Sequence, residues 1–146
     1  MLLRVDQMAQ EPLYLQIRGQ IVGAIARGDL EPNDSLPSVR SLATDLGINL
    51  HTVNKAYAIL RDEGYIVMRG RSGARVADYA ESHSEEKLAR TEQALAGELM
   101  KLATEYRARG GSLEQFAQLA ADQATKAFSA GAASAFETCS TTTKNN

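Results

Sequence analysis

The shortest connection between two amphipathic stretches of the sequence constrains the fold most. Ser38 follows Pro37 as a good N-cap for a helix that ends at Gly47, and Asn49 can cap the next helix. Apolar residues recur at helical spacing along the first of these helices: Val39, Leu42, Ala43 and Leu46. Two helices joined through a single intervening residue, Ile48, must cross steeply. The spacing therefore predicts a helix-turn-helix.

The helix predicted after Asn49 has an apolar back and a polar front. Its inward face is formed by residues at i, i+3, i+4 and i+7: Val53, Ala56, Tyr57 and Leu60. The polar side chains of its N-terminal half contain no carboxylate: Asn49, His51, Thr52, Asn54 and Lys55. The acids Asp62 and Glu63 come only at the far end, before Gly64 closes the helix. A helix of this kind suits the DNA major groove, which the N-terminal half of the second helix of a helix-turn-helix enters.

The flanking segments complete a small domain. A helix over roughly 12–27 is predicted from apolar residues at helical spacing, with Gly28 as its stop. The alternation of Leu3 and Val5 with charged residues is typical of a short strand, and residues 31–34 (EPND) predict a turn.

A β-hairpin is predicted after the third helix. Two short apolar runs, 65–68 and 74–77, flank the glycine-rich turn 69–73. Arginines mark this region: Arg69, Arg71 and Arg75. The order helix, helix, helix, hairpin is that of a winged helix. The chain as a whole has a net charge of −2, but residues 40–77 hold six cations against three carboxylates, a local net charge of +3. Attraction for a polyanion is thus concentrated at the predicted reading helix and wing.

The C-terminal part predicts two further helices. Steps of four and three give the first a heptad-like seam ending before Gly110-Gly111: Leu88, Glu92, Leu95, Leu99, Leu102 and Tyr106. Ser112 and Gln115 form a capping box for the second, whose inner stripe is Leu113, Phe116, Ala120, Ala124 and Phe128. A seam of this kind needs a partner surface, either a second copy of the chain or the last helix of the same chain.

The predicted fold class is therefore mainly α, with an N-terminal winged helix-turn-helix (three helices plus a β-hairpin wing) and a C-terminal two-helix dimerisation region. The expected division is a DNA-binding domain at 1–78, a polar linker at 79–84, the dimerisation region at 85–136 and a disordered tail at 137–146.

Several motifs resemble the DNA-binding domain of the GntR family of bacterial transcription regulators over roughly residues 10–77. They are Tyr-x-Gln-Ile from residue 14, Gly-Asp-Leu from 28, Leu-Pro-Ser-x-Arg at 36–40, Leu-Ala-x-x-Leu-Gly at 42–47, Thr-Val at 52–53 and Glu-Gly at 63–64. The pattern Asn-x-x-Thr-Val-x-Lys-Ala-Tyr at 49–57, with a short C-terminal region, resembles the YtrA-type subfamily. That resemblance implies a homodimer made by the C-terminal helices, and often control of transporter operons.

The resemblance also implies which residues contact DNA. They lie before the second helix, at the start of the third and at the wing tip: Ser38, Arg40, Asn49, Leu50, His51, Thr52, Asn54, Lys55, Arg69, Gly70, Arg71 and Ser72. The expected dimer contacts are Leu88, Leu95, Leu99, Leu102, Tyr106, Leu113, Phe116 and Ala120. Many relatives carry an arginine or a Pro-Asn pair where this chain has Leu50 and His51, so the operator sequence stays open. The wing, Arg-Ser-Gly-Ala-Arg, also departs from the commoner Gly-x-Gly-Thr-Phe.

Other interpretations remain open for single residues and for the whole chain. Arg40 is equally suited to a surface ion pair with Asp45, and Asn49 to a purely capping role. A winged helix can also serve as a protein-interaction module. The run Gly70-Arg71-Ser72-Gly73 matches the GxxG loop of RNA-binding KH domains, although strands rather than helices are predicted around it.

Enzymatic activity is not expected. The sequence has no Gly-x-x-x-x-Gly-Lys loop, and His51, His83 and Cys139 are too scattered to predict a metal site. We expect no cofactor and leave open whether a small-molecule effector exists. The single cysteine and the polar N-terminus, with no signal peptide or membrane span, predict a cytoplasmic protein in a reducing compartment. The partners expected are double-stranded operator DNA and a second copy of the chain.

Overall fold

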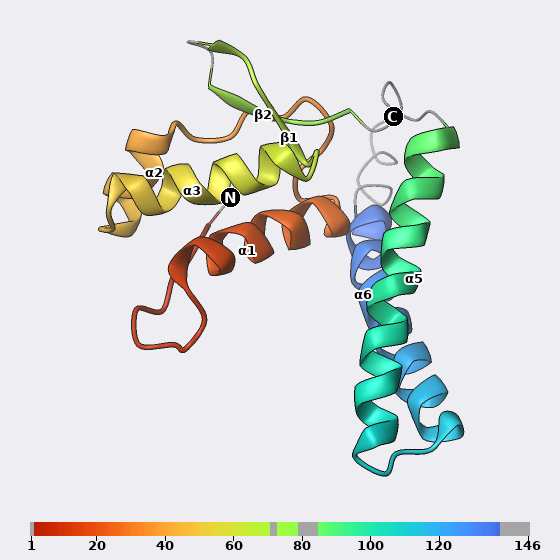
Figure 1. Cartoon of the computed structure of the whole chain (residues 1–146). Helices are drawn as coiled ribbons and strands as arrows, with labels where there is room; N and C mark the ends of the chain where they lie inside the picture. Colours follow the sequence, from red (N-terminus) through yellow and green to blue (C-terminus); the bar gives the residue numbers. More distant parts are fainter. Residues whose placement is uncertain (1, 71–72, 79–84, 138–146) are drawn as a thin grey trace, which may run out of the picture. The chain divides into compact units, whose positions relative to one another are not determined.

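The computed structural model describes residues 2–70, 73–78 and 85–137, except for the side chains of 131–137. These residues form five α-helices and one two-stranded antiparallel sheet (Figure 1). The chain divides into two compact units, one built on Met1–Asp78 and one on Tyr79–Ala130. The predicted fold class, a winged helix-turn-helix followed by a helical region, is confirmed.

Three helices make the body of the first unit: α1 (Leu13–Arg27), α2 (Val39–Leu46) and α3 (Leu50–Asp62). Gly47 ends α2 with φ at 63°, a left-handed conformation that costs glycine little and lets the chain turn at once into α3. The turn at 31–34 is also confirmed, and Asn33 adopts φ of 70° in it. Asparagine tolerates this conformation better than most residues.

The core of this unit lies where α1 and α2 pack against α3. Its most deeply buried side chains come from all three helices and the hairpin: Ile17, Ile21, Leu42, Val53, Ala56, Tyr57, Leu60, Ile66 and Val76. The Tyr57 hydroxyl donates a hydrogen bond of 2.8 Å to the Pro37 carbonyl, just before α2. Burial raises the pKa of Tyr57 to about 12. Tyr57 is thus a core residue, as expected, and also ties α3 to the start of α2.

The wing consists of β1 (Ile66–Met68) and β2 (Ala74–Val76), paired with Ile66 opposite Val76 and Met68 opposite Ala74. A third segment, which the sequence did not indicate, lies along the other edge of β2. Ser35 forms an isolated antiparallel bridge with Arg75, and the Leu36 N–H donates to the Ala74 carbonyl at 2.9 Å. The base of the wing is therefore fixed from both sides.

The prediction of a strand at Leu3 and Val5 was wrong. This segment has no strand partner, because side-chain amides of α1 satisfy its backbone instead. Gln16 accepts from the Asp6 N–H at 2.9 Å and donates to the Asp6 carbonyl at 2.9 Å. Gln20 makes the equivalent pair with the N–H and carbonyl of Arg4. The two glutamines, one turn apart, hold the segment extended without a sheet.

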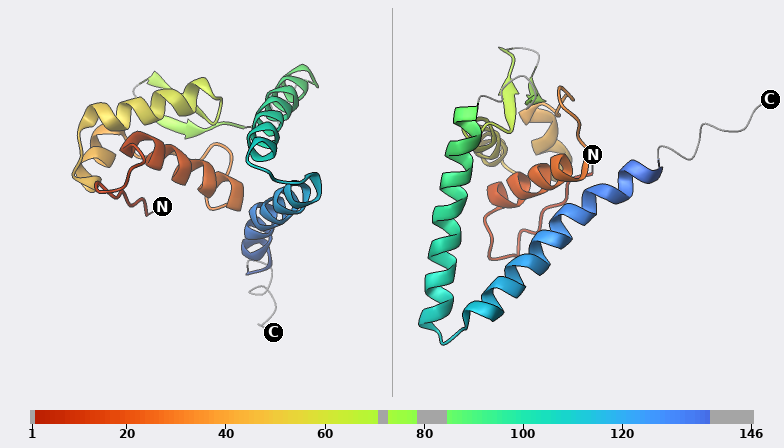
Figure 2. Two further views of the ribbon diagram at one scale, coloured as in Figure 1. Left: turned by 60° about the horizontal axis from the view of Figure 1, so that its bottom comes forward. Right: turned by 90° about the vertical axis from the view of Figure 1, so that its right-hand side faces the viewer.

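The second unit consists of α5 (Glu85–Ala108) and α6 (Leu113–Glu137). The predicted capping box is present, since the Gln115 N–H donates to Ser112 Oγ and the Ser112 N–H donates to Gln115 Oε1, both at 3.2 Å. The two helices diverge from the Gly110-Gly111 turn instead of packing along their length (Figure 2). The predicted linker 79–84 and residues 138–146 of the predicted tail lie outside the described residues, and Glu137 still belongs to α6.

Candidate nucleic-acid interface

The N-terminus of α3 is built by a local cap. Asn49 Oδ1 accepts a hydrogen bond of 2.8 Å from the His51 N–H, which is one of the donors that a helix start leaves without a backbone partner. The cap uses the amide oxygen, and Asn49 itself is exposed. The capping role is thus confirmed, and the same side chain still presents its amide nitrogen at the surface.

Most of the predicted contact residues are exposed, as a reading face requires. Those with exposed side chains or backbone are Ser38, Arg40, Asn49, Leu50, His51, Asn54, Lys55, Arg69 and Gly70. Thr52 is half-buried, and Leu50 exposes 43% of its surface despite being apolar. Arg71 and Ser72 lie outside the described residues. Because α2 and α3 meet at Gly47, the start of α2 and the start of α3 belong to the same helix-turn-helix.

Arg40 does not form the ion pair with Asp45 that its spacing allowed. Among the described residues, its guanidinium has neither an ion pair nor a hydrogen bond, and only its carbonyl is used, by Thr44 Oγ1 at 2.9 Å. Ser38 caps α2 as predicted, accepting from the Ser41 N–H at 3.1 Å. Arg40 therefore stands in the first turn of α2 with its charge directed to solvent.

The two acids at the C-terminal end of α3 form ion pairs with arginines. Asp62 accepts from Arg61 at 2.8 Å, and Glu63 accepts from Arg18 of α1 at 2.7 Å. The hydrogen bond to Glu63 is the main reason why the pKa of Arg18 lies above its usual value. The Arg18 guanidinium also lies over the Tyr65 ring, 5.7 Å from its centroid. Negative charge on this helix is thus both distant from its N-terminal half and matched by arginine.

Lys55 makes a contact that sequence reasoning missed. Its Nζ lies 3.9 Å from the centroid of the Tyr14 ring, in the first turn of α1. This is within the range of a cation–π interaction. No sequence signal could have found the pair, because the two residues belong to different helices and come together only when α1 packs on α3.

The wing brings its cations to different environments. Arg69 is exposed at the end of β1, and its N–H donates to the Gly73 carbonyl at 2.9 Å. Arg75 is half-buried in β2, and its Nε is buried without a hydrogen-bond partner among the described residues. The loop 70–73 joins two strands, whereas the GxxG loop of a KH domain joins two helices. The structure therefore removes the basis of the RNA-binding interpretation.

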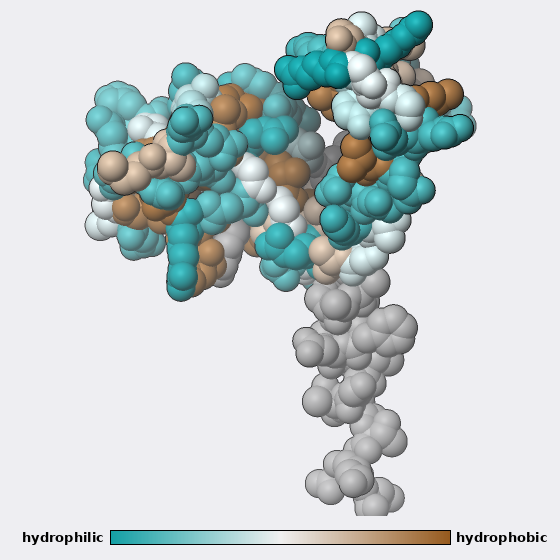
Figure 3. Space-filling view, turned by 90° about the horizontal axis from the view of Figure 1, so that it is seen from below, coloured by the Kyte–Doolittle hydropathy of each residue, from teal (hydrophilic) through white to brown (hydrophobic). Residues whose placement is uncertain are grey.

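The leucines among the predicted dimer residues are exposed on the second unit. α5 buries none of its residues, and its leucines Leu88, Leu95, Leu99 and Leu102 are between 42% and 58% exposed. On α6, Leu113 and Phe128 are 81% and 86% exposed, so they form no inner face within the single chain. Figure 3, a view from below, shows apolar surface in brown among hydrophilic surface in teal.

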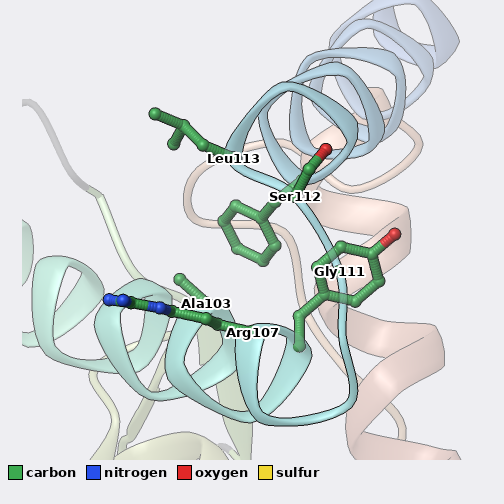
Figure 4. Close-up of a pocket in the computed structure, with 7 residues that line it drawn as sticks. Ala103, Arg107, Gly111, Ser112 and Leu113 are labelled. Carbon is green, nitrogen blue, oxygen red and sulfur yellow. The ribbon is translucent and has the colours of Figure 1, made fainter.

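Contact between α5 and α6 is concentrated at their turn. Tyr106 and Phe116 meet with ring centroids 5.9 Å apart and planes inclined by 45°. Beside them is a cavity of about 320 Å³, which is lined by Ala103 and Arg107 of α5 and by Leu113 of α6 (Figure 4). Tyr106, Phe116 and Ala120 are half-buried accordingly. Of the two partners predicted for the α5 seam, the last helix of the same chain, α6, contacts the seam only at this end.

The described part of the chain contains neither a metal-binding cluster nor a membrane-spanning helix. No group of three or more His, Cys, Asp or Glu side chains is placed to hold a metal ion there. None of the helices in that part is long and apolar enough to cross a membrane.

Comparison with known proteins relates this geometry to a family. The family model described as bacterial regulatory proteins, gntR family, matches residues 13–76. The regulator YhcF of Bacillus subtilis is 35% identical over 89 residues, which are 61% of this chain and 74% of YhcF. This chain belongs to the GntR family. It contains a GntR-type DNA-binding domain, and the curated relatives that it matches are transcription regulators, not enzymes.

Other GntR relatives extend the similarity to the YtrA type. The repressor YtrA of Bacillus subtilis is 42% identical over 71 residues, 48% of this chain and 55% of YtrA. The solved structure of YtrA from Sulfolobus acidocaldarius, a GntR-family transcription factor, is 41% identical with a TM-score of 0.51, covering 66% of this chain and 99% of that one. The match to the regulator Rv1152 of Mycobacterium tuberculosis spans 64% of that protein's length. Sequence similarity to YtrA of Bacillus subtilis and to Rv1152 thus covers less than two thirds of each of these proteins.

A further solved structure resembles the chain over most of its length. A protein from Listeria monocytogenes described as a transcriptional antiterminator has a TM-score of 0.71 at 25% identity, and the match covers 88% of this chain and 93% of that one. The resemblance to the GntR family and its YtrA type, inferred from the motifs, is confirmed.

Proposed function

We propose that this GntR regulator is a sequence-specific repressor that binds an inverted-repeat operator as a homodimer. The observation that carries the proposal is the N-terminal half of α3, which is capped, free of carboxylates and carries exposed polar side chains that include Lys55, while Arg40 is exposed in the first turn of α2. A helix with this surface can meet base edges and phosphates in the major groove. The acids at the other end of α3 are already paired with arginines and do not repel the phosphates.

The exposed leucines of α5 support the dimer. A single chain leaves Leu95, Leu99 and Leu102 42% to 58% exposed on one helix. α6 does not cover them, since it diverges from α5 beyond the turn (Figure 2). Burial of the apolar side chains in such a heptad-like row by another helix is favourable, because it removes their surface from water. A second copy of the chain offers the same row and is the partner that the proposal assigns to it.

Repression and the choice of target rest on relatives. YtrA of Bacillus subtilis, 42% identical over 71 residues, is named a repressor. A dimer bound across a promoter excludes RNA polymerase by occupancy alone. The YtrA-type resemblance points to a transporter operon as the target. As a DNA-binding regulator, the chain would act in the cytoplasm, with operator DNA and its own second copy as partners.

Substitution of two cations tests the reading face. Arg40→Ala and Lys55→Ala should each weaken binding to an operator duplex several-fold, measured by fluorescence anisotropy at near-physiological salt. If Lys55 contacts a phosphate, its loss should also lower the slope of log affinity against log salt by about one for each subunit, or about two for the dimer. Lys101→Ala on exposed α5 is the matched control and should leave affinity unchanged.

Each outcome of this test has a defined meaning. Unchanged affinity in both Arg40→Ala and Lys55→Ala would show that the reading face is misassigned. Absence of salt-sensitive binding in the unmodified chain would favour a winged helix that binds proteins. A monomer in sedimentation at micromolar concentration would contradict the dimer and leave the DNA-binding face to be tested separately.

A further inference from the structure

One aromatic ring outside the helix-turn-helix touches the proposed reading helix. Tyr14 is in the first turn of α1, and its ring lies beneath the Lys55 ammonium with Nζ 3.9 Å from the ring centroid. Lys55 is exposed and Tyr14 is half-buried. The ring therefore occupies one side of the ammonium, while the other side remains open to solvent.

A lysine side chain without a contact does not hold its ammonium group at one position. Its charge is carried on a flexible four-carbon side chain, and ordering that chain on binding has an entropic cost. A cation held over an aromatic face has lost part of that freedom before any ligand arrives. The ammonium has three donor hydrogens, so those that point away from the ring can still bond to an anionic oxygen.

We propose that Tyr14 is a positioning residue that holds the Lys55 ammonium in place for a DNA phosphate. This inference rests on the proposed function, because it assigns a role within DNA binding. Tyr14 acts through Lys55 and need not touch DNA. The packing of α1 against α3 thus contributes to recognition directly, by fixing where one cation of the reading helix is held.

A purely structural role for Tyr14 predicts different behaviour. The ring is half-buried and also packs against the core, so its loss has some cost to stability. If that were its only role, its removal would weaken DNA binding whether or not Lys55 is present. If it positions Lys55, its effect on affinity must vanish when Lys55 has no charge. A double-mutant cycle separates the two.

The chain provides a matched control for such a cycle. Tyr65 is also half-buried, and a cation, Arg18, lies over its ring at 5.7 Å. This second pair lies beyond the C-terminal end of α3, close to the Arg18–Glu63 ion pair. Tyr65→Leu therefore removes a similar ring and a similar contact at the end of the helix that is not proposed to read DNA.

The first measurement needs no DNA. In the full-length free protein, the ε-methylene proton signals of Lys55 should be shifted upfield by the Tyr14 ring current. They should move to ordinary lysine positions in Tyr14→Leu and remain shifted in Tyr14→Phe, which keeps the ring. Ordinary positions in the unmodified protein would overturn the proposal.

The second measurement uses a duplex enriched by selection from a random pool. Tyr14→Leu should raise Kd about two- to five-fold per half-site, the range expected from one exposed cation–π contact, and Tyr14→Phe should stay within about two-fold per half-site. The salt slope of the dimer–operator complex should fall by about two in Lys55→Met, one for each subunit, and stay unchanged in Tyr14→Leu, which keeps the charge. Tyr65→Leu should leave Kd unchanged.

The double variant decides between positioning and structure. In a Lys55→Met background, Tyr14→Leu should have no further effect on Kd, and an equal loss there would overturn the proposal. Unchanged Kd in Tyr14→Leu alone would overturn it as well. If no duplex is enriched at all, the proposed function fails, and the positioning role fails with it, whereas the ring-current shift would still show that the Tyr14–Lys55 contact exists.

Discussion

Replacing Tyr57 with phenylalanine removes one hydroxyl group, which connects α3 to the residue before the N-cap of α2. The Tyr57 side chain is only 2% exposed, and its hydroxyl donates to the Pro37 carbonyl at 2.8 Å. Removing a neutral hydrogen bond of this kind costs about 1 kcal/mol of unfolding free energy. Because Pro37 is itself only half-buried, water can reach part of that region, so we expect no larger loss at pH 7.

The sign of this difference should reverse at high pH. Burial raises the pKa of Tyr57 from 10.0 to about 12 in the folded chain. Below pH 10, the pKa of tyrosine in the unfolded chain, the Tyr57 hydroxyl is neutral in both states and its contribution to the unfolding free energy is fully present. That contribution is lost as pH rises through 12, the pKa in the folded chain. Two pKa units correspond to about 2.7 kcal/mol at most. Phenylalanine cannot ionise, so Tyr57→Phe should become the more stable protein above about pH 10.6, where the loss equals about 1 kcal/mol.

Urea unfolding followed by circular dichroism measures this crossing. Both proteins are compared at one protein concentration from pH 7 to 11.5, since association with a second copy would otherwise alter apparent stability. Subtracting the two curves removes the other tyrosines, which both proteins share. A constant stability difference across this range would refute the reasoning, because it would mean that Tyr57 ionises alike in the folded and unfolded chain.

Three further substitutions test separate parts of the structure. Asn49→Ala removes the acceptor for the His51 N–H and should lower the unfolding free energy by about 1 kcal/mol in urea titrations, with a negligible loss arguing against the cap. Gly111→Ala would place a Cβ in collision with the Tyr106 ring, so the ring should leave Phe116 and the near-ultraviolet circular dichroism of this turn should fall. An unchanged spectrum would contradict the packing. Leu99→Glu puts a charge into the α5 row and should shift sedimentation toward the monomer, whereas an unaltered dimer would place the interface elsewhere.

The parts of the fold that could be predicted are those set by local chemistry. Ser38 and Asn49 each precede an apolar helical repeat, and both cap the helix that follows. Gly47 supplies the left-handed turn between the two helices. Such signals act within a few residues and do not depend on the rest of the chain, so the helix-turn-helix could be derived from sequence.

The errors and omissions concern residues distant in sequence. The alternation at Leu3 and Val5 is typical of a strand, but the segment is held by Gln16 and Gln20, whose polar side chains gave no signal of that role. The bridge between Ser35 and Arg75 was missed for the same reason. Each depends on how α1 and the hairpin are placed by the core, which no local pattern encodes.

The candidate site divides in the same way. The polar face of α3 followed from helical periodicity, whereas the DNA contact expected of Arg40, which is exposed, came from the resemblance to the GntR family. The contact of Lys55 with Tyr14 did not, because it is formed only when α1 packs across α3. The divergence of α5 from α6 also lay beyond sequence reasoning, since a heptad-like seam does not say whether its partner is the same chain or another.

Selection of bound duplexes from a random DNA pool, with the purified full-length protein at near-physiological salt, tests the central claim most directly. We predict enrichment of a two-fold symmetric motif with half-sites about one helical turn apart, as expected for a dimer that places one α3 in each major groove. Weak, salt-sensitive retention without an enriched motif would contradict sequence-specific reading by this helix.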